Sequence, residues 1–387
     1  MRAAVATVAP FLVATQATNL ALLVSAILAR RTLCLSELAR AYPRPVQRRV
    51  ARPKHDLLHC LKRLWRFLDN GRIDAVAVQA ALVPEVVARL GQPRRLGLAI
   101  DWTMFDTHLP SGRRARYQVL RIAIPRRGRA LPLLQVAYDR DRLPAGRSQN
   151  QLEEGALDVV LRALPPGVRG VVLADRGFAR ATFLAWLHAH PTGPDFVVRV
   201  DKGTCLTEPD GRRWKLGTEG LALTQLRWAP GVCYTLHHGR PRDLVVNVAL
   251  CWRASARRAS RRRHRVPAEP WYLATSLDRA EQAVAWYWQR GWIEQAFKDS
   301  KSRFGLKHVR IGCPARLSRL LAAFTFALAW LTLAALPELG ALPARWTTRV
   351  AHWGHASLIS LALALLDYLH DLPLVCLPPP ARSGGYA

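Results

Sequence analysis

Side chains that could act on a phosphodiester backbone occur at regular spacing in residues 287–301, namely Tyr287, Arg290, Glu294 and Lys301. On one α-helix, which turns by about 100° per residue, these four side chains would project within a sector of about 60°. An aromatic ring, two cations and one carboxylate in line would suit a polyanionic strand, held while the carboxylate acts at one phosphate. The spacing also fits a plain surface helix, because Arg and Glu four residues apart commonly form an exposed ion pair.

Two aspartates supply further carboxylates at the ends of expected strands. Asp101 ends an apolar strand that begins at Leu96, and Asp175 ends a second apolar strand at 168–175. Sites in open α/β sheets lie beyond the carboxyl ends of strands, so we expect both aspartates to meet Glu294. A pair of divalent cations would remove the repulsion among three carboxylates, and Mg²⁺ or Mn²⁺ suits oxygen ligands. Taken singly, Asp101 also fits a turn or cap residue, and Asp175 fits a surface partner of Arg176.

The hydrophobic periodicity predicts which elements would position these residues. Residues 1–93 are expected to be helical around a basic loop at 43–53, as a helix-turn-helix-like DNA reader or as a plain helical bundle. The region 94–200 is expected to form a mixed α/β layer, with strands at 96–105, 117–125, 130–138, 168–175 and 196–200 and helices at 152–164 and 179–189. Beyond it we expect a β-rich region at 201–270 with a cationic run at 253–265, a strand at 271–276, helices at 318–336 and 355–369, and a loose tail from Pro378.

The composition points to a partner with dense negative charge. The 387 residues carry a net charge of +30, which favours nucleic acid first and an anionic membrane surface second. Seven cysteines without a C-x-x-C pair argue against a zinc ribbon or a disulfide framework and favour a reducing cytoplasm. Two apolar stretches, 3–29 and 320–336, are interpreted as buried helices and not as a signal peptide or a membrane span.

The signature of a known family matches these residues. The spacing of Tyr287, Arg290, Glu294 and Lys301 resembles the YREK signature of DDE transposases of the insertion-sequence-four family. Asp175-Arg-Gly-Phe and Asp101-Trp-Thr resemble the surroundings of that family's second and first aspartates, and the resemblance covers about residues 95–310. It implies an α/β fold: an RNase H-like mixed-sheet catalytic core interrupted by a β-rich insertion domain, with helical N-terminal and C-terminal parts.

The resemblance implies a division of the chain into regions. These are a helical DNA-binding region at 1–93, the first part of the catalytic core at 94–200, an insertion domain at 201–270, the second part of the core at 271–310, and a helical C-terminal region with a loose tail at 311–387.

The same resemblance implies an activity and its residues. Asp101, Asp175 and Glu294 would hold two Mg²⁺ ions, for which Mn²⁺ could substitute, in cleavage of transposon ends and strand transfer into target DNA. Residues expected to contact DNA are Tyr287, Arg290, Lys301, Lys298 and Trp271. Of these, Trp271 would stack on or replace a flipped base, although core packing explains it nearly as well.

The partners implied are double-stranded DNA, as terminal inverted repeats and as target, and a second copy of the chain in a homodimeric synaptic complex. We expect no membrane, and a bacterial cytoplasmic location with the protein on the nucleoid when DNA-bound. Two alternatives stay open: a catalytically inactive remnant that still binds DNA, and a membrane-associated basic protein.

Overall fold

The computed structural model describes residues 1–42, 53–126, 128–218, 220–222, 225–235, 241–252 and 269–338. Most of the expected basic loop at 43–53, the cationic run at 253–265, the helix at 355–369 and the tail from Pro378 lie outside these residues.

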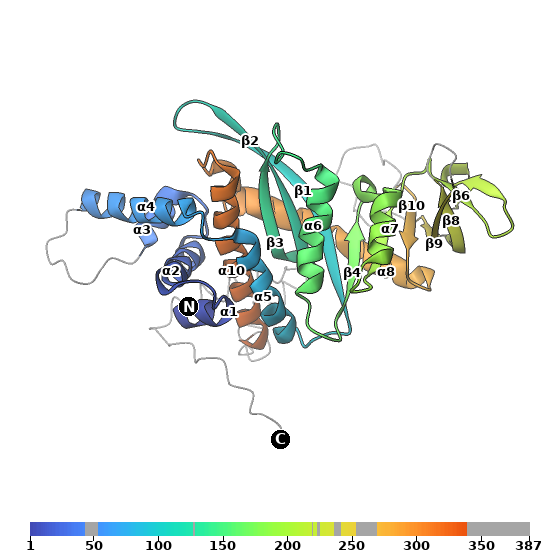
Figure 1. Ribbon diagram of the computed structural model, residues 1–387, viewed down its shortest axis with the longest axis horizontal. Helices are drawn as coiled ribbons and strands as arrows, with labels where there is room; N and C mark the ends of the chain where they lie inside the picture. The colour runs from blue at the N-terminus through green and yellow to red at the C-terminus, as the bar shows by residue number, and fades with distance from the viewer. Residues whose placement is uncertain are drawn as a thin grey trace, which may run out of the picture.

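Helices form the N-terminal part of the chain, as predicted. They are α1 (Arg2–Val8), α2 (Ala14–Arg30), α3 (Leu35–Ala41), α4 (Pro53–Asp69) and α5 (Ala75–Arg89). The start of α5 is set by Asp74, whose side chain accepts hydrogen bonds from the backbone amides of Val76 and Ala77. These helices gather around α10 (Pro314–Glu338), which begins four residues before the expected helix at 318–336 (Figure 1).

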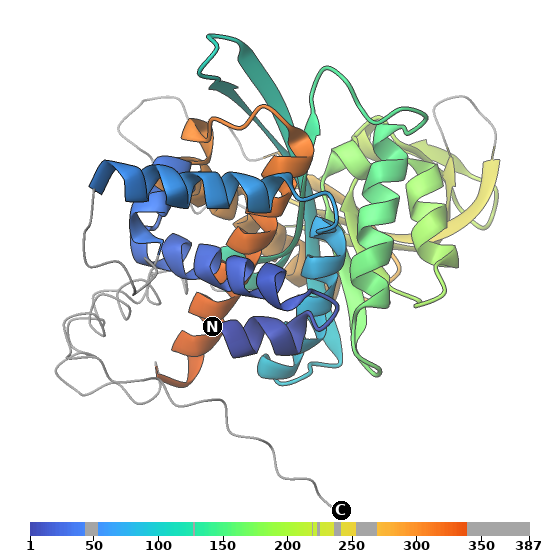
Figure 2. The same cartoon turned by 60° about the vertical axis from the view of Figure 1, so that its left-hand side comes forward.

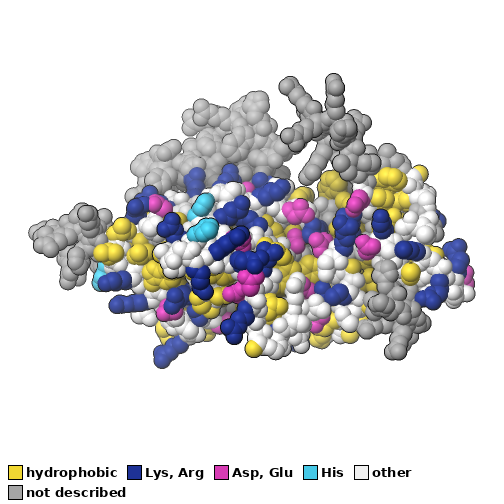
Figure 3. Space-filling model, turned by 90° about the horizontal axis from the view of Figure 1, so that it is seen from above, with side chains coloured by type: hydrophobic (Ala, Val, Ile, Leu, Met, Phe, Trp, Pro, Cys, Tyr) yellow, Lys and Arg dark blue, Asp and Glu magenta, His cyan; other side chains and the backbone are white. Residues whose placement is uncertain are grey.

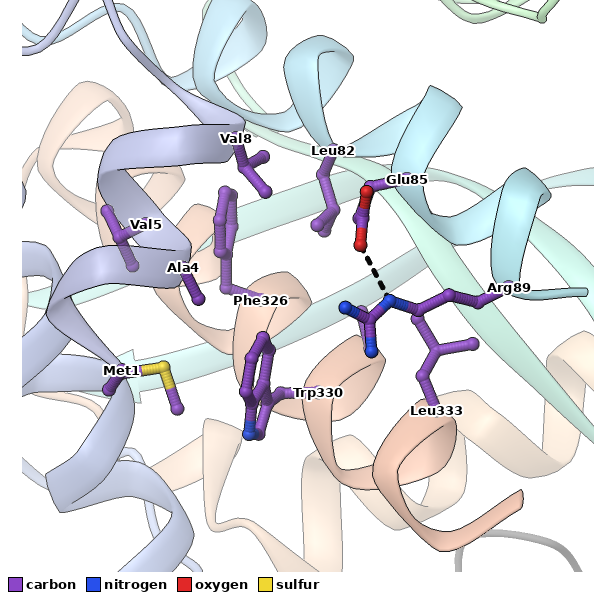
Figure 4. Close-up of a pocket in the computed structure, with 11 residues that line it drawn as sticks. Met1, Ala4, Val5, Val8, Leu82, Glu85, Arg89, Phe326, Trp330 and Leu333 are labelled. Atoms are coloured by element: carbon purple, nitrogen blue, oxygen red, sulfur yellow. Dashed lines mark hydrogen bonds and ion pairs between the residues drawn. The ribbon is translucent and has the colours of Figure 1, made fainter. Parts of the chain in front are cut away.

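Helix α10 is long and apolar enough to cross a bilayer, but it serves as a core helix here. Its stretch Pro314–Leu333 has a mean hydropathy of 1.3, and 83% of the most apolar part is buried inside the protein. Elsewhere in the described residues, α2 and α3 reach the length and hydropathy of a membrane span only when taken together, and their axes differ by 101°. Apolar side chains of α1, α5 and α10 line a small pocket whose charged members, Glu85 and Arg89, pair at 2.6 Å (Figure 4).

The described strands form one ten-stranded sheet in the order β3-β2-β1-β4-β5-β10-β9-β8-β6-β7. The first five are β1 (Arg95–His108), β2 (Arg114–Arg126), β3 (Arg129–Asp139), β4 (Arg169–Ala174) and β5 (Asp195–Arg199). Strands β1 to β3 are antiparallel neighbours, whereas β4 runs parallel to both β1 and β5. This mixed order agrees with the expected RNase H-like core.

The β-rich region continues the same sheet. Its strands are β6 (Cys205–Thr207), β7 (Arg213–Lys215), β8 (Leu226–Thr235) and β9 (Pro241–Cys251), with a short 3₁₀ turn, η2 (Leu216–Thr218), between β7 and β8. Another 3₁₀ turn, η1 (Arg176–Phe178), follows β4. Strand β10 (Trp271–Thr275) is antiparallel to both β5 and β9, so it joins these strands to the first five. The two ends of the sheet lie far apart in Figure 1, with the N-terminal helices near β3 and β8 at the opposite end.

Helices cover both faces of the sheet, and alternate residues of β1 point to different sides. Leu98 and Ile100 pack in the core that contains α6 (Gln149–Arg162) and α7 (Ala181–Ala189), which Figure 2 shows side by side. Ala99 packs in a second core with α8 (Ala280–Arg290) and α9 (Trp292–Lys298). The alternation therefore directs Asp101 toward α8 and α9.

Glycine allows α8 to approach β1 closely. A Cβ added to Gly97 would lie only 3.0 Å from the ring of Trp286, so the ring would have to move away. This close approach brings the α8–α9 stretch down onto the sheet beside Asp101.

The expected single helix over 287–301 is divided, so that prediction is wrong in detail. Helix α8 ends at Arg290, and Gly291, with φ −59° and ψ −15°, carries the helical path into α9. The path then widens into a π-helical turn, η3 (Asp299–Arg303), and a 3₁₀ turn, η4 (Leu306–His308), follows it. Lys301 lies in the π turn, so a 100° rotation per residue does not describe its direction.

Asp101 lies in the middle of β1 and not at its end, which corrects the strand boundary. Antiparallel pairing with β2 extends to His108, opposite Arg114, and keeps the strand intact beyond the aspartate. Parallel pairing with β4 stops at Ala99, opposite Leu173. Asp101 therefore lies just beyond the end of the parallel ladder, close to Asp175, which follows β4 directly.

Candidate active site

Three carboxylates from three elements converge on the guanidinium of Arg290. Its Nη2 lies 2.8 Å from Oδ2 of Asp101 and 3.1 Å from Oδ2 of Asp175. Its Nη1 lies 2.5 Å from Oε1 of Glu294, one helical turn further along. The three acids that were expected to meet are thus joined through one cation, Arg290, for which a contact to DNA phosphates was predicted.

Each aspartate divides its two oxygens between the backbone and the site. Oδ1 of Asp101 accepts the backbone amide of Trp102 at 2.8 Å. Oδ1 of Asp175 accepts the amide of Gly177 at 2.9 Å, which makes it the cap of the 3₁₀ turn η1. In both residues the second oxygen remains directed at the cation, so the local backbone fixes which oxygen points into the site.

Exposure increases across the site from Asp101 to Glu294. The side chains of Arg290 and Asp101 are 10% and 15% exposed, against 36% for Asp175 and 52% for Glu294. A ligand would therefore approach from the side of Asp175 and Glu294, with Asp101 at the closed end.

Burial dominates the electrostatics of the closed end. Loss of hydration raises the pKa of the Asp101 carboxyl to about 6; the Arg290 guanidinium opposes this rise, and the neighbouring Asp175 adds to it. Burial acts to lower the pKa of Arg290, but the surrounding carboxylates outweigh it and the pKa is raised. The site consequently holds a concentration of negative charge that requires a cation at its centre.

The donor atoms suit a divalent metal, but their present spacing suits a guanidinium. Mg²⁺ binds carboxylate oxygens at about 2.0–2.1 Å, so the oxygens of Asp101 and Asp175 would have to move inward by roughly 1 Å. Among the residues that the structure describes, no three His, Cys, Asp or Glu side chains form a group arranged to hold a metal ion. Metal binding here therefore requires the guanidinium to leave and the carboxylates to close in.

Two of the expected DNA-contact residues form an aromatic pair beside the acids. The rings of Trp271, at the start of β10, and Tyr287, on α8, meet edge to face at 5.0 Å. Tyr287 is buried, which raises its pKa to about 12, whereas Trp288 beside Trp271 is 49% exposed. Core packing thus accounts for Tyr287, and Trp271 stands between this core and the exposed Trp288.

The two expected lysine contacts lie at the end of the helical path. Lys298 is exposed at the last residue of α9, and Lys301 is half-buried in the π turn. Burial, together with the charge of Lys307, lowers the pKa of Lys301. Both lysines lie beyond Glu294 and outside the ion-paired cluster. Lys and Arg side chains are spread over much of the face shown in Figure 3.

Sequence reasoning missed a buried arginine behind the site. Arg121 is directly opposite Asp101 in the β1–β2 register and is fully buried. Its guanidinium bonds Oε1 of Gln135 at 2.6 Å and Oγ of Ser300 at 2.8 Å, and lies 4.3 Å over the ring of Phe297. Burial lowers its pKa to about 9. A cation inside the apolar run 119–124 was the available signal for this residue.

Comparisons with known proteins agree with this arrangement at the level of the family. Residues 92–330, more than half of the chain, match the family described as transposase DDE domain. No match was found among curated proteins. A solved structure of a piggyBac transposase synaptic complex with hairpin DNA is similar at 13% identity and a TM-score of 0.45, over 95% of this chain and 77% of that one.

Proposed function

This chain belongs to the transposase DDE domain family, and on that premise we propose that it is an active DNA transposase. It would cleave DNA at the ends of its own element and join the freed 3′ ends to target DNA. The observation that carries the proposal is the convergence of Asp101, Asp175 and Glu294 on one buried cation. Such a cluster has no structural need for three acids, because one carboxylate would neutralise the arginine.

We propose that the three carboxylates hold two divalent cations, Mg²⁺ or Mn²⁺, once DNA is bound. Metal ions in such a site activate the attacking oxygen and stabilise the leaving oxygen of the phosphodiester. Each aspartate would supply its Oδ2, because its Oδ1 is engaged by the amide of Trp102 or Gly177. Glu294, the most exposed of the three, completes the set from the helix.

Arg290 would exchange partners during this assembly. Its guanidinium neutralises the acids in the structure described here, and a DNA phosphate near the scissile bond would accept it when cations take over that task. Lys301 and Lys298 would contact phosphates further along the strand. Tyr287 would support Trp271, whose ring would stack on an unpaired terminal base.

The spacing of Tyr287, Arg290, Glu294 and Lys301 places the chain, in our proposal, in the insertion-sequence-four group. We further propose the regional division given above, with residues 1–93 binding DNA. The substrate would be double-stranded DNA with terminal inverted repeats, bound by a homodimer in the bacterial cytoplasm. The net charge of +30 supports a polyanionic partner of this kind.

The test is cleavage by the full chain of DNA that carries the inverted repeats flanking its own gene. Wild-type protein should nick this DNA with Mg²⁺ or Mn²⁺ and not with EDTA. Glu294→Gln should slow nicking by about 10³-fold, the equivalent of several kcal/mol of charge stabilisation. Glu281→Gln, an exposed glutamate in the first turn of α8, is the matched control and should leave the rate unchanged.

Two outcomes would refute the proposal. A wild-type chain that binds the repeats but never nicks them under metal titration would be the DNA-binding remnant. Equal rates for Glu294→Gln and wild-type protein would remove Glu294 from the site.

A further inference from the structure

A buried glutamate on α6 contacts both segments that carry the aspartates. Glu153 is 1% exposed, and its carboxylate faces three donors. Its Oε1 accepts hydrogen bonds from the indole Nε1–H of Trp102 at 2.6 Å and from the side-chain amide Nε2 of Gln149 at 3.1 Å. Its Oε2 accepts one from Nη2 of Arg180 at 2.5 Å. A glutamate is rarely this deeply buried unless it is paired, so these contacts define its position.

The first arm of this contact leads to Asp101. Trp102 follows Asp101 in β1, and its backbone amide is the donor that holds Oδ1 of the aspartate. Because neighbouring strand residues point to opposite faces, the Trp102 ring lies on the α6 side while Asp101 faces α8 and α9. Fixing the indole therefore fixes the peptide that orients the carboxylate.

The second arm leads to Asp175. Arg180 donates from Nη1 to the backbone oxygen of Gly177 at 3.0 Å while its Nη2 holds Glu153. The amide of the same Gly177 donates to Oδ1 of Asp175. The turn that directs Asp175 into the site is thus tied, through one arginine, to the carboxylate that also ties Trp102.

We propose that Glu153 is a positioning residue that sets the relative placement of Asp101 and Asp175 from the opposite face of the sheet. It does not touch the reacting atoms, because the sheet separates it from them. A carboxylate is required, since it offers an acceptor oxygen to each arm, whereas an amide offers only one. The part of this inference that concerns metal positioning rests on the proposed function. The coupling of the Asp101 and Asp175 segments can be measured whether or not the protein is a transposase.

The experiment follows backbone hydrogen exchange in the full chain, in EDTA and without DNA. Glu153→Ala should raise exchange at the amides of Trp102 and Gly177 by roughly ten- to a hundredfold, because buried bonds to a charged group are lost. Glu153→Gln should loosen at least one of the two segments. The control is Glu281→Gln, an exposed glutamate in the first turn of α8, which should exchange as wild type at both segments.

Two further variants separate the arms and keep the test valid if Glu153→Ala does not fold. Trp102→Phe removes the indole donor and should loosen the Asp101 segment alone. Arg180→Gln should loosen the Asp175 segment alone. The inference is overturned if Glu153→Gln exchanges as wild type at both segments, or if exchange rises equally throughout the chain, since that is a loss of general stability.

Metal binding supplies the second readout. In Glu153→Gln the Mn²⁺ concentration for half-saturation, measured by electron paramagnetic resonance and by DNA nicking, should rise about 10- to 100-fold. The rate at saturating Mn²⁺ and the binding of a short labelled duplex should stay near wild type. An unchanged Mn²⁺ requirement overturns the positioning role.

The two failures are distinguishable. If wild-type protein neither binds Mn²⁺ nor nicks DNA, the proposed function and the metal-positioning role fail together, even where the exchange pattern demonstrates the coupling. If wild-type protein nicks DNA but the exchange pattern is absent, only the role of Glu153 fails.

Discussion

Replacing Arg290 with Gln would remove the cation that three carboxylates share in the metal-free chain. Glutamine is neutral and retains part of the aliphatic stem, so the variant reports mainly on charge. We expect Arg290→Gln to lower the free energy of unfolding at pH 8 in EDTA by about 3 kcal/mol. We also expect Mn²⁺ to restore more of this stability than it adds to wild-type protein.

The magnitude follows from the exposure of each partner. Removing one member of a buried ion pair costs about 3–5 kcal/mol, and the Arg290–Asp101 pair is the buried one, with side chains 10% and 15% exposed. The links to Asp175 and Glu294 are 36% and 52% exposed on the acid side, so each contributes below about 1 kcal/mol. Protonation of Asp101, whose pKa already lies at about 6, would relieve part of the loss and favours the lower end of the range.

The assay is urea unfolding of both proteins in EDTA and in saturating Mn²⁺. In wild-type protein the metal must displace the guanidinium before it binds, so part of its binding free energy is spent on that exchange. The variant has no such competitor and should bind Mn²⁺ more tightly, although it should cleave DNA poorly. Arg279→Gln, a 69% exposed arginine at the start of α8, is the control and should change stability by less than about 0.5 kcal/mol.

The reasoning would be refuted if Arg290→Gln lost the same stability in Mn²⁺ as in EDTA. It would also be refuted if the variant bound Mn²⁺ more weakly than wild type. Either result would mean that Arg290 does not occupy the position where a metal is needed.

Three further predictions concern single side chains near the site. Folding raises the pKa of Asp101 to about 6, so the protonated carboxyl contributes to the free energy of unfolding fully below about pH 4, and this contribution is lost as the pH rises through 6. In EDTA, Asp101→Asn should therefore remove roughly 3 kcal/mol of the pH dependence of the unfolding free energy across that window. Trp271→Ala should slow end cleavage by about 10- to 100-fold, as expected for a lost base-stacking platform, and Trp271→Phe should retain most of the rate; equal rates would assign the ring to packing alone. Arg121→Met should lower the free energy of unfolding by about 2–4 kcal/mol in urea titration, because the acceptors on Gln135 and Ser300 lose a buried charged donor; an unchanged midpoint would contradict this.

The sequence predicted the elements that are determined by local patterns. Apolar periodicity predicted that residues 1–93 are helical and predicted the succession of strands and helices along the α/β layer, since those patterns reflect burial of one face. The convergence of Asp101, Asp175 and Glu294 was also anticipated, because strand ends that run parallel meet at one edge of a sheet. Their roles in catalysis stay predictions.

What the sequence did not predict depends on contacts between distant residues. The path of β1 past Asp101 is set by antiparallel pairing with β2. The π turn that contains Lys301 interrupts a helix whose sequence pattern alone would continue it. The position of Arg290 among the acids, and not on an open face, results from the packing of α8 on the sheet, chiefly on β9, β4 and β5. Nothing local signalled the role of Glu153, because the two donors that tie it to the aspartate segments, Trp102 and Arg180, lie 51 and 27 residues away.

Strand β10 makes the region after β5 mechanically continuous with the mixed α/β core. All five of its residues pair with β9 and the last three pair with β5, so β8 and β9 cannot rotate away from the core without breaking a backbone ladder. Trp271 is the first residue of that strand. Because Trp271 pairs with Cys251 of β9 and its ring meets that of Tyr287, a displacement of the outer strands would be transmitted to α8, the helix that carries Arg290.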